Sequence, residues 1–217
     1  MDITKRRMTK IARELNKFTV QTMKEEPKVC HYLDLPIQHA NDEILRRMGR
    51  RTSKQELIDK IDFLRSEMPD ITLRTTLITG FPGETKEQHK ELLEFINDME
   101  FDRLGVFTYS PEEGTPAATM EHQIDEEVKL DRQAELMELQ QDISAELGER
   151  RIGQELLVMI EGKVADEDAY VGRSQADAPG VDGYVFVNTP ETLVSGDFVR
   201  VKITGALEYD LIGEISQ

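Results

Sequence analysis

The chain has 217 residues, of which 38% are hydrophobic and 32% are charged, and its net charge is −16. This length suits one large or two modest domains, and the acidity disfavours nonspecific nucleic-acid binding and favours a basic partner, unless the charge serves only solubility. The single cysteine, Cys30, excludes an intrachain disulfide and any cysteine-only metal site built from this chain alone.

The sequence contains no sign of a membrane segment or a secretory signal. No apolar run approaches the roughly 20 residues that span a bilayer. The amino-terminal residues 1–15 are basic but have no continuous apolar core. We therefore expect a cytoplasmic protein with no membrane partner.

Strand-like and helix-like segments alternate up to about Gly148. The apolar and β-branched bias of strands occurs in Val29–Ile37, Leu73–Thr79 and Leu104–Tyr109. Helical patterns occur in Asn41–Met48, in Ser53–Met68, in Lys86–Met99 and in Glu126–Leu147. The expected caps are Asn41, Ser53 with Glu56, Thr85 with Gln88, and Gly148 at the end of the last helix. Repeated strand–helix–strand units imply parallel pairing, and three strands cannot close a barrel, so this part looks like half of a larger one.

The stretch Leu73–Thr85, with the sequence LRTTLITGFPGET, reads as a buried strand, a glycine-rich turn and the start of a helix. Gly80, Pro82 and Gly83 break the strand. Ligands of α/β folds bind where strands end and loops turn into helices. The turn is therefore a candidate ligand site.

After Gly148 the pattern changes to short strands separated by Gly, Asp and Pro. The strand-like runs are Leu156–Ile160, Ala169–Arg173, Gly183–Val187, Phe198–Ile203 and Leu211–Ile215. They predict a small five-stranded antiparallel β-barrel of the OB-like kind. We expect an α/β chain of two domains, residues 1–148 and 149–217.

Four blocks, in this order, resemble the radical S-adenosylmethionine (SAM) methylthiotransferases: VCHYLDLPIQHANDEIL, LRTTLITGFPGET, FDRLGVFTYSPEEGTPA and VGRSQADAPGVDGYVFV. The resemblance runs from about Thr22 to the end of the chain. It is closest to the branch that modifies an aspartate of a ribosomal protein. It implies that residues 1–148 are the second half of a TIM-like radical SAM barrel and that residues 149–217 are a TRAM domain.

The resemblance also implies a chemistry. In the family, SAM is cleaved at one 4Fe–4S cluster, the resulting radical abstracts hydrogen from the aspartate β-carbon, and sulfur from a second cluster is added and methylated. The implied substrate is small ribosomal subunit protein twelve, with the ribosome as a further partner. The protein part of such an enzyme supplies positioning and excludes water.

The family's cluster-binding cysteines have no counterpart in this sequence. Its C-x-x-x-C-x-x-C triplet and the three cysteines of its amino-terminal domain are absent, and Cys30 lies in a predicted strand. We therefore expect a fragment that holds no metal and is inactive alone. Half a barrel exposes strand edges and an apolar interior, which predicts dimerisation, swapping or aggregation.

Two candidate site residues lie on one face of the second strand. Alternate residues share a face, so Arg74 and Thr76 point the same way, which the resemblance places inside the barrel. Arg74 would pair with a carboxylate of the cofactor or of the target aspartate, or else with Asp34 on the neighbouring strand. We leave both alternatives open.

Four more residues are candidate cofactor contacts: Gln38, Gly80, Gly83 and Tyr109. The glycines would let a ligand approach the backbone closely, or they only make the turn. Gln38 would hydrogen-bond the cofactor, and Tyr109 would stack on adenine or substrate or be a buried aromatic. Glu84 falls one position late for the glutamate of a common adenosine-binding pattern, so we assign it no contact.

The remaining polar residues are given plainer interpretations. His39 follows Gln38 at the expected mouth of the barrel, where it would bind a ligand or, as we favour, be a surface histidine. His31, His89 and His122 are expected to be structural or solvated. A basic cluster would contact RNA or phosphate, or is simply a solvated helix end; its members are Arg46, Arg47, Arg50, Arg51 and Lys54. No residue is assigned a catalytic role.

The charge of the carboxyl-terminal part bears on the substrate. Residues 151–217 contain 5 Lys and Arg against 12 Asp and Glu, a net charge of −7. An acidic domain is a poor phosphate binder and suits a basic ribosomal protein better. Two alternatives remain: part of a transfer-RNA methylthiotransferase, whose TRAM domain would bind RNA, and a non-enzymatic TRAM docking module.

Overall fold

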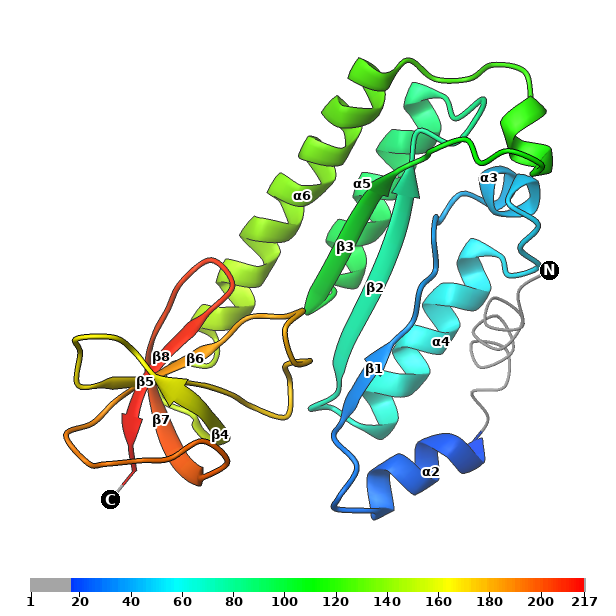
Figure 1. Ribbon diagram of the computed structural model, residues 1–217. Helices are drawn as coiled ribbons and strands as arrows, with labels where there is room; N and C mark the ends of the chain where they lie inside the picture. The colour runs from blue at the N-terminus through cyan, green and yellow to red at the C-terminus, as the bar shows by residue number, and fades with distance from the viewer. Residues whose placement is uncertain (1–16, 217) are drawn as a thin grey trace. The chain divides into compact units, whose positions relative to one another are not determined.

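The computed structural model describes residues 17–216, and the chain falls into two compact units that divide inside one long helix, between Leu139 and Gln140. Figure 1 shows a small sheet with helices in the first unit and a barrel of short strands in the second. No helix within residues 17–216 combines the length and the apolar character needed to cross a bilayer.

The first unit alternates strands and helices. Its elements are α2 (Lys17–Glu25), β1 (Tyr32–Asp34), α3 (Asp42–Arg47), α4 (Lys54–Glu67), β2 (Thr72–Thr79), α5 (Lys86–Met99), β3 (Arg103–Thr108), the 3-10 helix η1 (Pro116–Thr119) and the first half of α6 (Glu126–Glu149). The strands form a parallel sheet in the order β1-β2-β3. The predicted parallel strand–helix–strand units are therefore confirmed.

The two faces of this sheet differ in burial. On β2, Thr75, Leu77 and Thr79 are 0% exposed. Arg74 and Thr76, at the alternate positions, are partly exposed. Crossover helices cover the buried face of a parallel sheet, and Figure 1 shows α5 behind β2 and β3. The other face, which bears Arg74 and Thr76, is here called the open face.

The first strand is shorter than the predicted Val29–Ile37. β1 covers only Tyr32–Asp34, so Cys30 lies outside it and is exposed, contrary to the expectation of a strand cysteine. The regular ladder ends after Leu35, whose N–H donates to the Arg74 carbonyl at 2.8 Å, and the next backbone bond to β2 comes from Gln38, one residue later than a regular ladder would place it. Pairing resumes at Gln38, which bridges to Leu77.

The predicted helix starts are confirmed. The Asn41 side chain accepts hydrogen bonds from two backbone N–H groups at the start of α3. The capping boxes of Ser53 with Glu56 and of Thr85 with Gln88 are both formed. Each box satisfies backbone donors that the first turn of a helix leaves unpaired.

The predicted end of the long helix at Gly148 is wrong. α6 continues to Glu149, and Gly148 is an interior residue of its last turn. A Cβ at Gly148 would lie 3.1 Å from the Cβ of Ala206. The glycine therefore allows close packing of the helix in the second unit and does not supply a left-handed cap.

The second unit contains the end of α6 and five strands that close into a barrel. These are β4 (Glu155–Lys163), β5 (Ala169–Arg173), β6 (Val185–Asn188), β7 (Phe198–Ala206) and β8 (Leu211–Ile215), in the spatial order β4-β5-β6-β8-β7. The five-stranded barrel is thus confirmed. It differs from a wholly antiparallel barrel at one place, because β6 and β8 pair in parallel.

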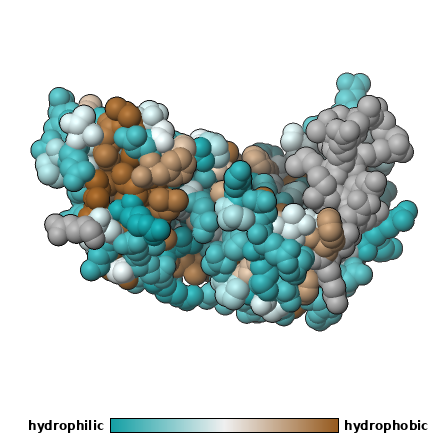
Figure 2. Space-filling model, turned by 90° about the horizontal axis from the view of Figure 1, so that it is seen from below, coloured by the Kyte–Doolittle hydropathy of each residue, from teal (hydrophilic) through white to brown (hydrophobic). Residues whose placement is uncertain are grey.

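The barrel has its own apolar interior and an apolar patch outside. The interior is formed by Val158, Ile160, Tyr170, Val185, Val187, Val201, Ile203 and Leu211. Outside, Phe198 is 64% exposed and stands opposite Met159, while Leu157 is 54% exposed. Figure 2 shows hydrophobic residues gathered on the surface of the lobe at the carboxyl terminus. A surface of this kind is typical of a protein contact.

Candidate functional site

A pocket of about 600 Å³ lies at the carboxyl ends of the three parallel strands; we call it the main pocket. Each strand contributes at or just beyond its end: Gln38 after β1, Ile78 on β2 and Tyr109 after β3. Ile44, Phe81 and Tyr109 form an apolar cluster beneath it. This is the edge at which α/β folds bind small molecules, and the volume is in the usual range of about 300–1,000 Å³.

Gln38 lies at this mouth, as the sequence predicted, although its role toward a cofactor stays a prediction. Its backbone has a φ of 74°, a left-handed conformation that is uncommon outside glycine. Two hydrogen bonds fix that conformation: Gln38 N–H donates to the Thr76 carbonyl at 2.9 Å, and Ile78 N–H donates to the Gln38 carbonyl at 2.8 Å. The backbone of a pocket residue is thus held in place by β2.

Tyr109 is a buried aromatic that also lines the main pocket, so both interpretations of it hold in part. Its ring meets Phe81 edge to face, with the centroids 5.1 Å apart. Its hydroxyl is buried and has no hydrogen-bond partner within residues 17–216. Burial, followed by the charge of Glu112, raises the pKa of Tyr109, so the phenol is neutral at pH 7. A buried hydroxyl without a protein partner is available to a ligand.

Arg74 and Thr76 lie together on the open face. The Arg74 Nη1 is 2.7 Å from the Asp34 Oδ2 and 3.4 Å from the Thr76 Oγ1. The ion pair with the neighbouring strand, one of the two alternatives, is therefore present. The Asp34 side chain keeps 40% of its surface exposed. A carboxylate arriving from outside would compete with Asp34 for the same guanidinium.

Gly80 and Gly83 both have left-handed backbones, with φ of 70° and 76°. Neither lines the main pocket. The groups that approach them closely belong to this chain: an added Cβ would lie 2.4 Å from the Lys129 Cγ at Gly80 and 2.3 Å from the Arg47 Nη1 at Gly83. Both glycines are thus favoured by the left-handed turn, and Gly80 also by the packing of the Lys129 stem; their contact with a cofactor stays a prediction.

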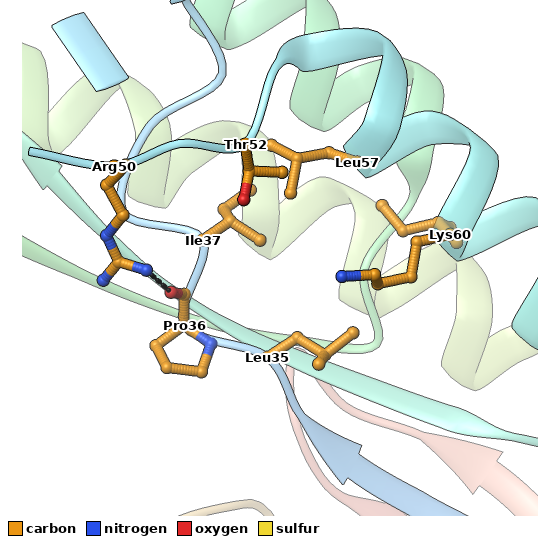
Figure 3. Close-up of a pocket in the computed structure, with 8 residues that line it drawn as sticks. Leu35, Pro36, Ile37, Arg50, Thr52, Leu57 and Lys60 are labelled. Atoms are coloured by element: carbon orange, nitrogen blue, oxygen red, sulfur yellow. Dashed lines mark hydrogen bonds between the residues drawn. The ribbon is translucent and has the colours of Figure 1, made fainter. Parts of the chain in front are cut away.

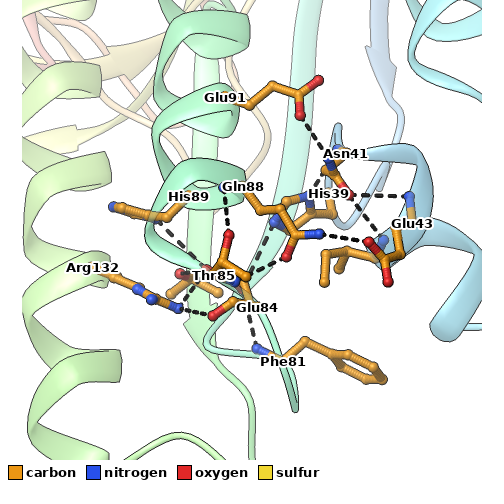
Figure 4. A network of polar contacts seen from close by, with 12 residues as sticks. His39, Asn41, Glu43, Phe81, Glu84, Thr85, Gln88, His89, Glu91 and Arg132 are labelled. Atoms are coloured by element: carbon orange, nitrogen blue, oxygen red, sulfur yellow. Dashed lines mark hydrogen bonds and ion pairs between the residues drawn. The ribbon is translucent and has the colours of Figure 1, made fainter.

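Glu84 was assigned no cofactor contact from the sequence. In the structure it is the centre of a buried polar network (Figure 4). It is 2% exposed, and the Arg132 Nη1 lies 3.0 Å from its Oε1. Its carboxylate also accepts hydrogen bonds from the Phe81 N–H at 3.2 Å and the Thr79 hydroxyl at 3.3 Å. Burial raises the pKa of Glu84, while Arg132 opposes this shift. The carboxylate therefore closes the turn from Gly80 back onto the end of β2.

The expectation that His39 is at the surface is wrong. His39 is 0% exposed, its Nδ1 accepts the Asn41 N–H at 2.9 Å, and its Nε2 lies 3.7 Å from the Glu84 Oε2. Burial, followed by the charges of His89 and Arg132, lowers the pKa of His39 to about 3. The imidazole is therefore neutral at pH 7. The sequence pattern did not reveal this burial.

His89 has the structural role that the sequence predicted. It is 6% exposed on α5, and its Nε2 lies 2.7 Å from the Glu135 Oε2 of α6. Its Nδ1 lies 3.8 Å from the Glu84 Oε1. His89 thus joins two helices next to the Glu84 network.

Of the thirteen residues that line the main pocket, only Gln38 and Tyr109 were candidate site residues. Arg47 and Arg50, two members of the basic cluster, line the main pocket, and the Arg50 Nη1 donates to the Pro36 carbonyl at 3.1 Å. The rest of this wall comes from α3 and the segment around η1: Met48, Gly49, Thr115, Pro116, Ala117 and Met120. The cluster of arginines was the only available signal, because the other residues follow no motif.

A second, smaller pocket lies between β1 and α4 (Figure 3). Its volume is about 30 Å³, and Leu35, Ile37 and Leu57 are among its lining residues. Lys60 also lines it, and burial lowers the pKa of that amine. A space of this size suits about one water molecule and no larger ligand.

The described residues do not fit an iron–sulfur cluster. Within residues 17–216 there is no group of three or more His, Cys, Asp or Glu side chains placed to hold a metal ion. Cys30 is the only cysteine of the sequence, whereas a 4Fe–4S cluster is held by several thiolates.

Comparison with known proteins gives the same two-part division. A family model of the Radical SAM superfamily matches residues 5–96, and a model of the TRAM domain matches residues 152–215. The ribosomal protein uS12 methylthiotransferase RimO of Lachnoclostridium phytofermentans is 58% identical over 92% of this chain and 46% of its own length. The proteins of the same name from Desulfitobacterium hafniense and Clostridioides difficile are 54% and 46% identical, over 91% and 90% of this chain and 44% of their own lengths.

The chain therefore spans about half the length of the curated relatives it matches. The β-barrel coincides with the TRAM match, and β1, β2 and most of α5 fall in the Radical SAM match. These comparisons confirm the predicted resemblance: the chain is similar over most of its length to uS12 methylthiotransferases and contains matches to the Radical SAM superfamily and to the TRAM domain.

Proposed function

We propose that this chain forms one wall of the active site of a radical SAM methylthiotransferase that acts on an aspartate of ribosomal protein uS12. One observation carries the proposal: the main pocket has Gln38 and Tyr109 at the carboxyl ends of the parallel strands, and Ile78 of the same pocket shares the open face of β2 with Arg74 and Thr76. When bound, SAM supplies the hydrogen-abstracting radical and the methyl group of this reaction.

The main pocket has the properties of a SAM site. Its volume suits a molecule of that size, and the Gln38 amide and the buried Tyr109 hydroxyl offer polar partners. Arg74 lies further along the open face and would exchange Asp34 for the carboxylate of SAM or of the target aspartate. These residues bind and orient, while the apolar floor around Phe81 keeps water from the reacting atoms.

The cluster chemistry is assigned to a part outside this chain. The sequence has a single cysteine, so we propose that the isolated chain holds neither 4Fe–4S cluster and is inactive alone. Iron and sulfide content after anaerobic reconstitution tests this directly. Stoichiometric iron in the isolated chain would refute it.

For the substrate, we favour a basic ribosomal protein over transfer RNA. The region 151–217 has 12 acidic against 5 basic residues, and the barrel exposes Phe198 and Leu157. An acidic surface with an apolar patch fits a basic protein and repels phosphate. uS12 is the protein that the relatives' name specifies. On this proposal the reaction takes place in the cytoplasm, at or near the ribosome.

The test reunites the two parts. The chain is mixed with, or fused to, the part of the Lachnoclostridium phytofermentans relative that this chain does not cover, reconstituted with iron and sulfide, and incubated with uS12, SAM and a reductant. Mass spectrometry should find a methylthio group on one aspartate of uS12. Modification of transfer RNA in place of uS12 would support the alternative function, a transfer-RNA methylthiotransferase.

A binding assay with the isolated chain tests the remaining alternative, a non-enzymatic TRAM docking module. We expect uS12 to bind the chain and transfer RNA not to bind it. Retention of uS12 together with an inactive reunited enzyme would favour a docking module without catalytic function. Retention of transfer RNA but not uS12 would overturn the proposed substrate.

A further inference from the structure

The first half of α6 places two cationic side chains, Lys129 and Arg132, in the interior of the first unit. They are 5% and 7% exposed. A spacing of three residues puts both on one face of the helix. A buried charge is costly unless it is paired and hydrogen-bonded, so the partners of these two side chains indicate what they do.

Arg132 holds the turn that follows β2. Its Nη1 lies 3.1 Å from the Glu84 carbonyl oxygen and 3.0 Å from the Glu84 Oε1. The other Glu84 oxygen accepts the Phe81 N–H, and the Glu84 N–H donates to the Phe81 carbonyl at 2.9 Å. One guanidinium from α6 therefore fixes both the backbone and the side chain that close the loop carrying Phe81 (Figure 4).

Lys129 holds the end of β3. Its Nζ donates to the Tyr109 carbonyl at 2.9 Å and lies 5.7 Å from the centre of the Tyr109 ring. Its aliphatic part runs against Gly80, where even a methyl group would not fit. The same ammonium pairs with Glu126 at 3.0 Å. Lys129 therefore connects the first residue after β2 with the first residue after β3.

Neither cation lines the main pocket, yet each holds a residue that does. Phe81 and Tyr109 form the edge-to-face pair in the pocket floor. Arg132 fixes the loop that carries Phe81, and Lys129 fixes the backbone of Tyr109. Apart from the contact between the rings, the Tyr109 N–H donates to the Thr79 carbonyl at 2.9 Å, and the two cations add side-chain links from α6 to both loops.

We propose that Lys129 and Arg132 are positioning residues that hold Phe81 and Tyr109 in the arrangement that receives the ligand. This deepens the proposed function and rests on it, because SAM is taken as the ligand. Both residues act through the pocket wall and not by contact with the reacting atoms. Preorganisation of this kind improves binding by removing the cost of ordering loops.

The test compares four variants of the full chain. Lys129→Met keeps the aliphatic packing and removes the ammonium, and Arg132→Lys keeps the charge beside Glu84 but not the planar fork of donors. Glu126→Gln is the matched control for Lys129, because it breaks only the exposed pair. Leu136→Val is the control for helix stability, because Leu136 is 0% exposed on the same helix.

Two measurements are made on each variant. The first is hydrogen exchange at the amides of Phe81 and Glu84, in the loop held by Arg132, and of Tyr109, held by Lys129; it needs no ligand. The second is an NMR titration with SAM, which detects weak binding. We expect Lys129→Met and Arg132→Lys to speed loop exchange and to weaken SAM binding, each by about tenfold or more, the value of one hydrogen bond to a charged group. Both controls should stay near the unmodified chain.

The outcomes separate this inference from the proposed function. Unchanged exchange and affinity in both cation variants would overturn it, as would an equal effect of Leu136→Val at equal loss of stability. Faster exchange with unchanged SAM affinity would also overturn it. A full chain that binds no SAM would contradict the proposed cofactor site. Amide hydrogen exchange alone would then decide whether the two cations hold Phe81 and Tyr109 in place. If Arg132→Lys does not fold, Lys129→Met still tests the proposal at Tyr109, and unchanged exchange and SAM affinity in that variant would overturn it.

Discussion

At the scale of single residues, Glu84 joins the turn after β2 to helix α6. Its carboxylate is 0% exposed and accepts hydrogen bonds from the backbone, a hydroxyl and a guanidinium. A buried ion pair need not add stability relative to an apolar core, but removing one partner leaves the other charge uncompensated. Arg132 would be that remaining charge.

Replacing Glu84 by Gln should therefore destabilise the chain strongly. We expect a loss of about 3–5 kcal/mol in the free energy of unfolding, measured by urea denaturation. The control is Glu94→Gln, because the Glu94 side chain is 60% exposed and pairs with Lys90 at 3.5 Å. That surface pair should contribute about 1 kcal/mol or less. Equal losses in the two variants would contradict the role of Glu84.

His39 makes stability depend on pH. Its folded pKa is about 3, well below the ordinary histidine value of 6.5, so between these pH values the unfolded chain binds a proton that the folded chain does not bind. Stability from this residue is present above the unfolded pKa of 6.5 and is lost as the pH falls toward 3, by about 1.4 kcal/mol per pH unit.

The variant His39→Asn tests this dependence, because an asparagine oxygen still accepts the Asn41 N–H and does not titrate. Urea denaturation at pH 7 and pH 5 should show a smaller loss in the variant than in the unmodified chain. The raised pKa of Glu84 acts in the opposite direction in both proteins and cancels in the comparison. His122→Asn, at an exposed turn, should leave the dependence unchanged.

At the scale of elements, α6 belongs to both compact units. Lys129 and Arg132 serve the first unit, whereas Gly148 lies against Ala206 in the second. The compact units divide at Leu139, inside the helix, while the sequence pattern changes only after Gly148. The predicted domain boundary between residues 148 and 149 therefore needs an experiment of its own.

Two fragments decide where the second domain begins. We expect residues 140–217 to unfold cooperatively and residues 149–217 to be less stable by about 1.5 kcal/mol or more, because the shorter fragment lacks Ile143, which is 8% exposed. Thermal unfolding followed by circular dichroism measures the difference. Equal stability of the two fragments would support the boundary at residue 149.

At the scale of the whole molecule, the three-stranded sheet is incomplete by itself. Within residues 17–216, β1 and β3 each pair on one side only. Phe107 of β3 is 59% exposed on the open face, opposite Ile78. Unpaired strand edges and exposed apolar faces are places where chains associate.

The isolated chain should therefore self-associate. Sedimentation velocity at increasing concentration is expected to show dimers or larger species, and Phe107→Ser should shift the distribution toward the monomer. Phe18→Ser, at an exposed position of α2, is the matched control and should have no such effect. A folded chain that stays monomeric at all concentrations would count against the prediction.

Local sequence rules predicted the elements better than the site. The capping boxes at Ser53 and Thr85 depend on residues three positions apart, so they were readable from the sequence. Glu84 and Arg132 are 48 positions apart, and their pairing has no local signature. Gln38 and Tyr109 were placed correctly because the carboxyl ends of parallel strands meet at one edge, a rule of topology and not of sequence motif.

The sequence by itself determined the two-part architecture, the parallel strand–helix–strand units, the five short strands of the barrel and the resemblance to radical SAM methylthiotransferases. Periodicity, caps and motif order are local properties, which explains why they could be read without a structure. Only the tertiary structure decided that His39 and Glu84 are buried, that α6 continues through Gly148, and that Lys129 holds the Tyr109 loop. Burial and pairing depend on side chains brought together from distant segments, and no single stretch of sequence contains that information.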